Sequence, residues 1–252
     1  MRNVAKIVLL AFAAAAMLAA QGHGFGGPER GFSMGMMGPV DRTPVTGAPY
    51  SATEVRTSVQ TLANGNQIQH QDQTLIYRDS QGRVRYETKI SAPDGGPAHT
   101  SVTIFDPVAG NVVRLNADKQ TANVSALRTR STMSPYFARQ HASGRPGETT
   151  EDLGPATISG RAATATRTTR TIPAGAIGNQ QPIVMTRTVW MSPDLKVPLQ
   201  IVSEDPRWGT TTVTLTNIVQ AEPNAALFQI PSGYTVKTMP AGHRGGRPAE
   251  SE

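Results

Sequence analysis

Residues 183–234 read IVMTRTVWMSPDLKVPLQIVSEDPRWGTTTVTLTNIVQAEPNAALFQIPSGY, and this stretch decides the fold of the chain. It predicts three successive β-strands, because runs of Val, Ile, Leu and Thr are separated by segments rich in Pro, Asp and Gly. The separating segments, residues 192–196 and 206–209, have the composition of tight turns. The third run, residues 210–219, is rich in Thr, a β-branched residue that favours strands.

The middle strand of this stretch has a clear two-residue period. Val197, Leu199 and Ile201 are aliphatic, and the polar Gln200 lies between the last two. Successive side chains of a strand point to opposite faces of its sheet. We therefore expect the three aliphatic side chains to be buried and Gln200 to face the other way.

Upstream of this stretch the chain has the same organisation of strands and turns. Val55 and Val59 alternate with polar residues such as Glu54, which predicts an antiparallel meander with one apolar and one water-facing side. Asn64-Gly65 then gives a strong hairpin signal, because both residues tolerate a positive φ. The predicted strands cover residues 53–60, 67–77, 84–90, 102–104, 113–115, 153–158, 162–172, 183–190, 197–203 and 210–219.

Helical periodicity is weak along the chain, and the best helix signal is the short segment 134–142, which contains Tyr136 and Phe137. A sheet of roughly ten strands without long helices must curl on itself or leave a concave apolar surface for a ligand. The sequence therefore predicts a mainly β protein with a curved antiparallel sheet and one or two short helices. A closed barrel and a β-sandwich are the alternatives.

Composition divides the chain into four parts. Residues 1–20 combine a positive start at Arg2 and Lys6, an apolar run and small residues at its end, which is the pattern of a secretory signal peptide. Residues 21–49 are rich in Gly, Met and Pro and are expected to be flexible. Residues 50–238 are predicted to form a single β domain, and residues 239–252 a disordered tail. The expected location is the periplasm or the outside of a bacterial cell.

Charge and cysteine content limit the function further. The chain contains no Cys, which excludes disulfides, thiol catalysis and Cys-based metal sites. Its net charge is +6 and its pI is near 10.0. An export signal argues against nucleic acid as the partner. The charge favours contact with anionic lipid head groups or polysaccharide, or serves solubility alone.

Several short motifs resemble those of one protein family. The closing segment carries Trp190, then Pro198-Leu199, Asn217-Ile218, Phe228 and finally Pro231-Ser232-Gly233-Tyr234. This order is similar to the ending of the LolA-like periplasmic lipoprotein carriers and of their sensor relatives of the RseB type. The earlier motifs Ile104-Phe105-Asp106-Pro107 and Arg114-Leu115-Asn116 also resemble the family's strand–turn–strand. The resemblance implies an open half-barrel.

Two classes of function follow. The first is a non-enzymatic envelope protein that binds a lipid, a lipoprotein's acyl chain or an apolar segment of an envelope protein, and that meets the membrane only peripherally. The second is a structural or interaction module without a small ligand. An open concavity lined by apolar residues favours the first class, and complete burial of those residues favours the second. The candidate ligand-binding residues are Val102, Ile104, Leu199, Val213, Leu215, Tyr136 and Phe137.

Signals for catalysis and for cofactors are weak. The chain has no Gly-x-Ser-x-Gly, Ser-x-x-Lys or His-Glu-x-x-His motif, so we expect neither an enzyme nor a cofactor. His70 and Asp72 share one face of a predicted strand and could form a base or a pair of metal ligands, but solvent or structural roles are favoured. Met34, Met36 and Met37 could hold Cu(I), but three Met residues in a Gly-rich segment are a weak signal, and an unstructured linker is favoured.

Overall fold

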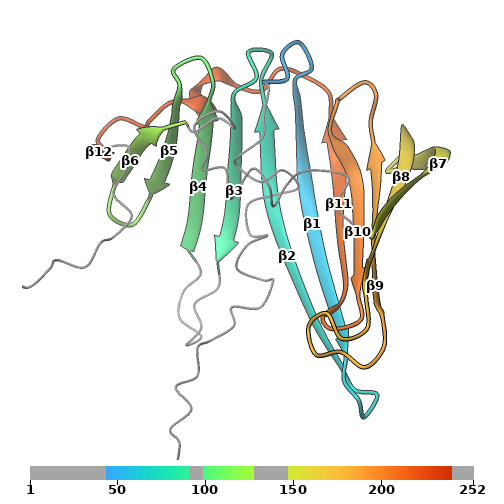
Figure 1. Cartoon of the computed structure of the whole chain (residues 1–252). Helices are drawn as coiled ribbons and strands as arrows, with labels where there is room; N and C mark the ends of the chain where they lie inside the picture. The colour runs from blue at the N-terminus through green and yellow to red at the C-terminus, as the bar shows by residue number, and fades with distance from the viewer. Residues whose placement is uncertain (1–43, 91–98, 128–146, 240–252) are drawn as a thin grey trace, which may run out of the picture. The chain divides into compact units, whose positions relative to one another are not determined.

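Twelve strands form one continuous sheet in the residues that the computed structural model describes, which are 44–90, 99–127 and 147–239 (Figure 1). Antiparallel pairing joins all neighbours except β12 and β6, which are parallel. The strands are β1 Tyr50–Thr61, β2 Gln67–Arg78, β3 Val84–Ile90, β4 His99–Asp106, β5 Asn111–Asn116, β6 Thr121–Ala126, β7 Glu148–Ile158, β8 Arg161–Ile172, β9 Ile183–Met191, β10 Pro198–Asp205, β11 Gly209–Val219 and β12 Thr235–Met239.

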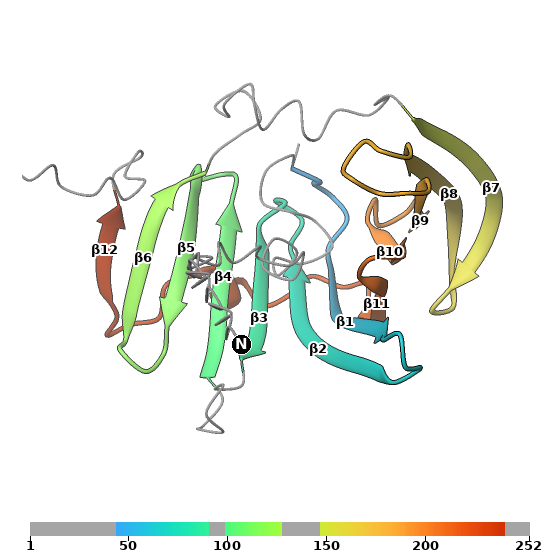
Figure 2. The same cartoon turned by 60° about the horizontal axis from the view of Figure 1, so that its bottom comes forward.

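The sheet is curved and open. Its order is β12-β6-β5-β4-β3-β2-β1-β11-β10-β9-β8-β7, so β12 and β7 are two free edges, which Figure 2 shows at opposite ends of the sheet. The predicted half-barrel is confirmed, and the alternatives of a closed barrel and a β-sandwich are not found. The predicted helix over residues 134–142 and the predicted signal peptide lie outside the described residues.

Hairpins and turns form where the sequence predicts them. Asn64-Gly65 lies between β1 and β2, where the Gly65 nitrogen donates to the Leu62 carbonyl at 2.9 Å and Gly65 has a φ of 82°. The strands β6 and β12 were not predicted, because β12 lacks a regular apolar alternation and the alternating residues of β6 are two alanines and one valine.

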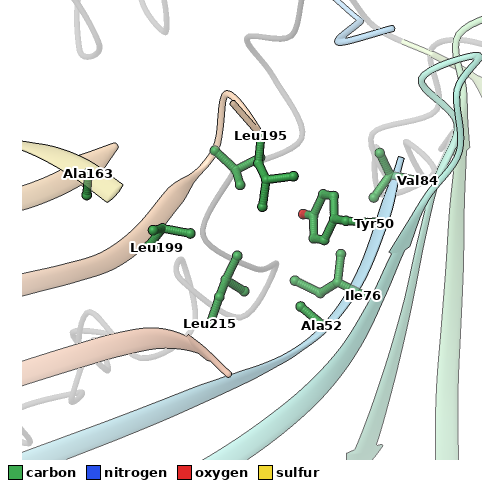
Figure 3. Packing of buried hydrophobic residues seen from close by; sticks show 9 residues of the cluster. Tyr50, Ala52, Ile76, Val84, Ala163, Leu195, Leu199 and Leu215 are labelled. Carbon is green, nitrogen blue, oxygen red and sulfur yellow. The ribbon is translucent and has the colours of Figure 1, made fainter. Parts of the chain in front are cut away.

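One core cluster, called cluster 1 here, lies on the concave face of the sheet, apart from Ala163, which the β8–β9 register places on the opposite face. Side chains from β1, β2, β10, β11 and the β9–β10 turn point toward one another in it (Figure 3). Residues from strands that are far apart in the sheet can meet in this way only if the sheet curves toward that face. The buried members of cluster 1 are Tyr50, Ala52, Ile76, Val84, Ala163, Leu195, Val197, Leu199 and Leu215.

A second cluster, called cluster 2, lies on the opposite face, called the outer face here. The register pairs Arg85 with Ile104, and Ile76 with Tyr86, so Ile104 and Ile76 occupy opposite faces. The segment between β11 and β12, which includes the 3-10 helix η3 Ala225–Phe228, supplies the cover for the outer face. The buried members of cluster 2 are Val102, Ile104, Val113, Leu115, Ala122 and Phe228.

The expectation of one apolar and one water-facing side is therefore wrong. In β1 the buried side chains are Tyr50, Ala52 and Glu54, whereas Val55 and Val59 are only half-buried. Each face of the sheet is apolar where a connecting segment covers it, and different segments cover the two faces. A period of two identifies which side chains share a face, but it does not identify the face that the rest of the chain will cover.

The end of β2 carries a buried arginine that joins three segments. Arg78 is 1% exposed. Its Nε and Nη2 donate to the Ala48 carbonyl at 3.0 and 2.6 Å, and Nη2 also donates to the Leu195 carbonyl at 2.5 Å. The guanidinium lies 4.7 Å from the centre of the Tyr50 ring. Ala48 belongs to the segment that composition assigns to a flexible region, so the described part of that segment, residues 44–49, differs from the expectation.

Substitution of Leu199 tests which face of β10 is buried. Val197, Leu199 and Ile201 are 2%, 0% and 2% exposed, as expected, and the half-buried Gln200 donates to the Thr214 hydroxyl at 3.1 Å on the outer face. Leu199→Asp should lower the free energy of unfolding by at least about 3 kcal/mol, because it buries a carboxylate without a partner. Gln200→Asp should lower it far less. Equal shifts of the melting temperature would contradict the assignment of faces.

Gly209 offers a second test, because β11 passes very close to β1 at this point. A β-carbon on Gly209 would lie 2.1 Å from the Val59 carbonyl oxygen and 2.9 Å from the Gln60 α-carbon, and the φ of Gly209 is 88°. Gly65→Ala is the matched control, since Gly65 has a φ of 82° but no neighbour within 4 Å. Gly65→Ala should lose about 1–2 kcal/mol of stability from backbone conformation alone. Gly209→Ala should lose clearly more in urea denaturation, and equal losses would show that β1 can move away.

Candidate functional site

The structure places the sequence-predicted ligand residues on opposite faces. Val102 and Ile104 belong to cluster 2 on the outer face, whereas Leu199 and Leu215 belong to cluster 1 on the concave face. Val213 lies on the concave face two residues before Leu215. Tyr136 and Phe137 lie outside the described residues. The described candidates therefore do not form one surface.

All five described candidates are core side chains. Their exposed fractions are 8% for Val102, 0% for Ile104, 0% for Leu199, 5% for Val213 and 1% for Leu215. Side chains of the protein itself fill the concave face at the level of cluster 1. Complete burial of the candidate residues was expected for a structural module without a small ligand, and it favours that class for this part of the sheet. A ligand on the concave face has to bind beyond cluster 1.

Beyond cluster 1 the concave face becomes polar. The register aligns one residue from each of seven adjacent strands, from β2 to β7, in a single line across this face. We call this line the polar row, and its members are His70, Ser58, Thr211, Ser203, Arg187, Thr168 and Thr150. Five of the seven carry hydroxyl groups. No hydrogen bond is found for any of these five hydroxyls within the described part of the chain.

A second arginine lies on the cluster 1 side of the polar row. Arg56 precedes Ser58 by two residues, so both side chains leave β1 on the concave face. The Arg56 Nε is buried and has no hydrogen-bond partner among the residues that the structure describes. Asp72 is directly opposite Arg56 in the β1–β2 register, but it is exposed, and the described residues show no ion pair between the two.

Arg187, the β9 member of the polar row, is surrounded by protein and is still open to water. Burial lowers the pKa of Arg187, and no neighbouring charge contributes to that shift. The residue as a whole is nevertheless exposed. Both properties are expected for a side chain on a concave surface that water can enter, because protein surrounds the group on several sides without sealing it.

Two exposed isoleucines lie on the concave face outside cluster 1: Ile68 follows the polar row along β2, and Ile90 ends β3. Ile68 of β2 is 39% exposed and Ile90 of β3 is 42% exposed. Ile68 pairs with Gln60 and leaves its strand on the same face as His70 and Ile76. The concave face therefore runs from the apolar cluster 1, through arginine and hydroxyl groups, to exposed aliphatic side chains.

The structure does not join the candidate catalytic residues into a pair. His70 and Asp72, the candidate base pair, are both exposed and make no hydrogen bond with each other in the described residues. The same residues contain no group of three or more His, Asp or Glu side chains that could hold a metal ion. No described helix is long and apolar enough to cross a membrane. The chemistry that remains on this face is hydrogen bonding, positive charge and apolar contact.

No family model and no curated protein matches the chain. Solved structures that it resembles include the MucA/MucB complex of Pseudomonas aeruginosa, at 14% identity over 77% of this chain and 59% of the matched chain, with a TM-score of 0.43. They also include the Mycobacterium tuberculosis lipoprotein LppX, at 14% identity over 70% and 90% of the two chains with a TM-score of 0.33. A LolA superfamily protein from Nitrosomonas europaea matches at 10% identity over 77% and 96%, with a TM-score of 0.27.

At such identities the likeness concerns the fold alone. The chain spans 59% of the matched chain of the MucA/MucB complex, so the activity of that whole protein is not transferred to it.

Sequence reasoning missed the two arginines and the polar row. Arg56 and Arg187 are 131 positions apart, and each lies in an alternating run of polar and aliphatic residues. Only the order β1-β11-β10-β9 brings their strands into one neighbourhood. A sequence signal for this polar surface was the Thr and Ser content of residues 203–214, which is higher than expected for two strands that face a core.

Proposed function

We propose that this protein is a non-enzymatic component of the bacterial cell envelope, periplasmic or secreted. In this proposal it binds a lipid, an acyl chain or an apolar segment of another protein on the concave face of its sheet. The location is supported by the signal-peptide pattern of residues 1–20.

The observation that carries the proposal is the exposure of aliphatic side chains on the concave face of an unclosed sheet. Ile68 and Ile90 are about two-fifths exposed on this face, beyond the part that cluster 1 fills. Burial of aliphatic surface is the main source of affinity for an apolar ligand, and each methylene contributes about 0.8 kcal/mol. An apolar chain can therefore gain affinity on this face only beyond cluster 1.

A structural or interaction module without a small ligand is the second candidate. The burial of Leu199, Val213 and Leu215 favours it, because the protein fills the adjacent part of the concave face with its own side chains. In that case the exposed isoleucines contact another protein surface rather than an acyl chain.

Binding of uncharged alkyl alcohols tests the first candidate. 1-Dodecanol should bind the purified protein saturably at about one site, and the affinity should rise from decanol to tetradecanol because each added methylene buries more apolar surface. Isothermal titration or displacement of a neutral hydrophobic dye measures this. Absence of saturable binding by a folded, monomeric sample would favour the structural module.

Two variants of β2 locate the binding surface. Ile68→Ser removes an apolar side chain from the concave face, and Leu75→Ser removes one of equal exposure, 40%, from the outer face of the same strand. Ile68→Ser should weaken dodecanol binding about tenfold, the effect of losing roughly 1.4 kcal/mol of apolar contact. Leu75→Ser should leave the affinity unchanged. Equal effects of the two variants would contradict binding on the concave face.

A further inference from the structure

The polar row and the neighbouring Arg56 lie outside both core clusters. None of the seven residues of the row belongs to cluster 1 or cluster 2, and neither does Arg56. A stretch of concave sheet with hydroxyls on five of seven adjacent strands contributes little apolar burial. Its composition is therefore better explained by what it contacts than by the fold.

Arg56 is the residue of this surface whose side chain has a buried donor, the Nε, without an acceptor in the described residues. A buried donor on a charged group is costly when it is unsatisfied, and most such groups in proteins are paired. An anion that accepts from Arg56 would remove this cost.

Nearby carboxylates on the same face do not neutralise the two arginines in the described structure. Asp205 binds Arg207 at 2.7 Å, and this hydrogen bond holds the pKa of Asp205 below its usual value. Glu54 is buried and has an interaction of its own. Asp72 stays exposed opposite Arg56. No ion pair with a carboxylate is found for Arg56 or Arg187 within the described residues.

The spacing of the two arginines allows one anion to reach both. Ser58, Thr211, Ser203 and Arg187 stand on four adjacent strands, so the backbones of β1 and β9 are about 14 Å apart at the usual strand separation. Arginine side chains are long, and curvature toward the concave face brings their ends closer. Between them lie the hydroxyls of Ser58, Thr211 and Ser203, which can each donate one hydrogen bond.

We infer that this surface binds the phosphate group of an anionic amphiphile, with Arg56 and Arg187 as the charged donors and the hydroxyls of Ser58, Thr211 and Ser203 between them. The inference rests on the proposed function, since it gives the head group of the ligand whose apolar chain contacts Ile68 and Ile90. Guanidinium groups match the geometry of phosphate oxygens and make short, charge-assisted hydrogen bonds to them. A tetrahedral phosphate also offers enough acceptors for the hydroxyls.

Comparison of three ligands tests the inference. Dodecyl phosphate, 1-dodecanol and inorganic phosphate are titrated into the purified full chain under the same salt conditions. Dodecyl phosphate should bind at least about tenfold more tightly than dodecanol, because hydrogen bonds to charged groups are strong. Inorganic phosphate should bind much more weakly than dodecyl phosphate, since it lacks the chain.

Arginine variants assign the effect to this surface. Arg187→Gln and Arg56→Gln should each remove most of the preference for dodecyl phosphate while leaving dodecanol binding unchanged. Arg187→Lys should restore only part of it, because an ammonium group lacks the planar fork. Arg167→Gln is the matched control, since Arg167 lies next to Thr168 in β8 but faces outward, where its Nε donates to the Thr188 hydroxyl at 3.4 Å.

The outcomes separate this inference from the proposed function. Equal affinity for dodecyl phosphate and dodecanol would overturn the phosphate site and leave the apolar binding site intact. Binding of neither amphiphile would overturn both. If inorganic phosphate binds as tightly as dodecyl phosphate, the arginine site is supported, and its ligand is free phosphate rather than a lipid. An equal loss in Arg167→Gln would contradict the assignment to the concave face.

Discussion

The buried guanidinium of Arg78 is the contact on which the two halves of the concave face depend. It joins the Ala48 carbonyl of the entering segment to the Leu195 carbonyl of the β9–β10 turn, two points 147 positions apart in the chain. Without it, two carbonyls in the core would lose their donor, and removal of one partner from a buried charged contact typically costs about 3–5 kcal/mol. The next residue, Asp79, takes part in contacts that lead to the outer face. Asp79 accepts from Arg83 at 2.6 Å, and the Arg83 guanidinium lies 5.0 Å from the Phe228 ring of cluster 2. One tight turn therefore anchors the covers of both faces.

This arrangement explains how an open sheet without long helices can be stable. A sheet with two free edges cannot bury its apolar residues by closure. Here the turn with Leu195 and the entering segment cover the concave face near one end of the strands, and the segment between β11 and β12 crosses the outer face. Hydrogen bonds fix the crossing segment along its path: Arg85 donates to the Leu227 carbonyl at 2.8 Å, and the Ser80 nitrogen donates to the Glu222 carboxylate at 3.1 Å. Cover is thus limited to part of each face, and the remainder of the concave face is left for other contacts.

The sequence was sufficient for ten of the twelve strands, for the turns between them and for a curved antiparallel sheet, and insufficient for the site. Local signals such as Asn64-Gly65 and the alternation of Val197, Leu199 and Ile201 are properties of neighbouring residues, so they could be recognised without a structure. The buried face of β1 could not be recognised from the sequence, because it depends on which distant segment covers that face. In the structure Glu54 is buried, whereas Val55 was expected to be. For the same reason Val102 and Leu199, which look alike in sequence, prove to be core residues of opposite faces. The candidate site depends on a register that links seven strands, which no local pattern contains.

The division of the concave face also limits what the proposed ligand can be. An apolar chain that lay along the whole face would have to displace Leu199 and Leu215, which are 0% and 1% exposed, and would pass over unsatisfied arginine and hydroxyl groups. Both changes oppose binding, since the first disrupts a packed core and the second desolvates polar groups without replacing their hydrogen bonds. A ligand with an anionic group at the polar row and a chain directed toward Ile68 and Ile90 avoids both. In this orientation the head group lies at the polar row, and the chain crosses toward Ile68 of β2 and Ile90 of β3.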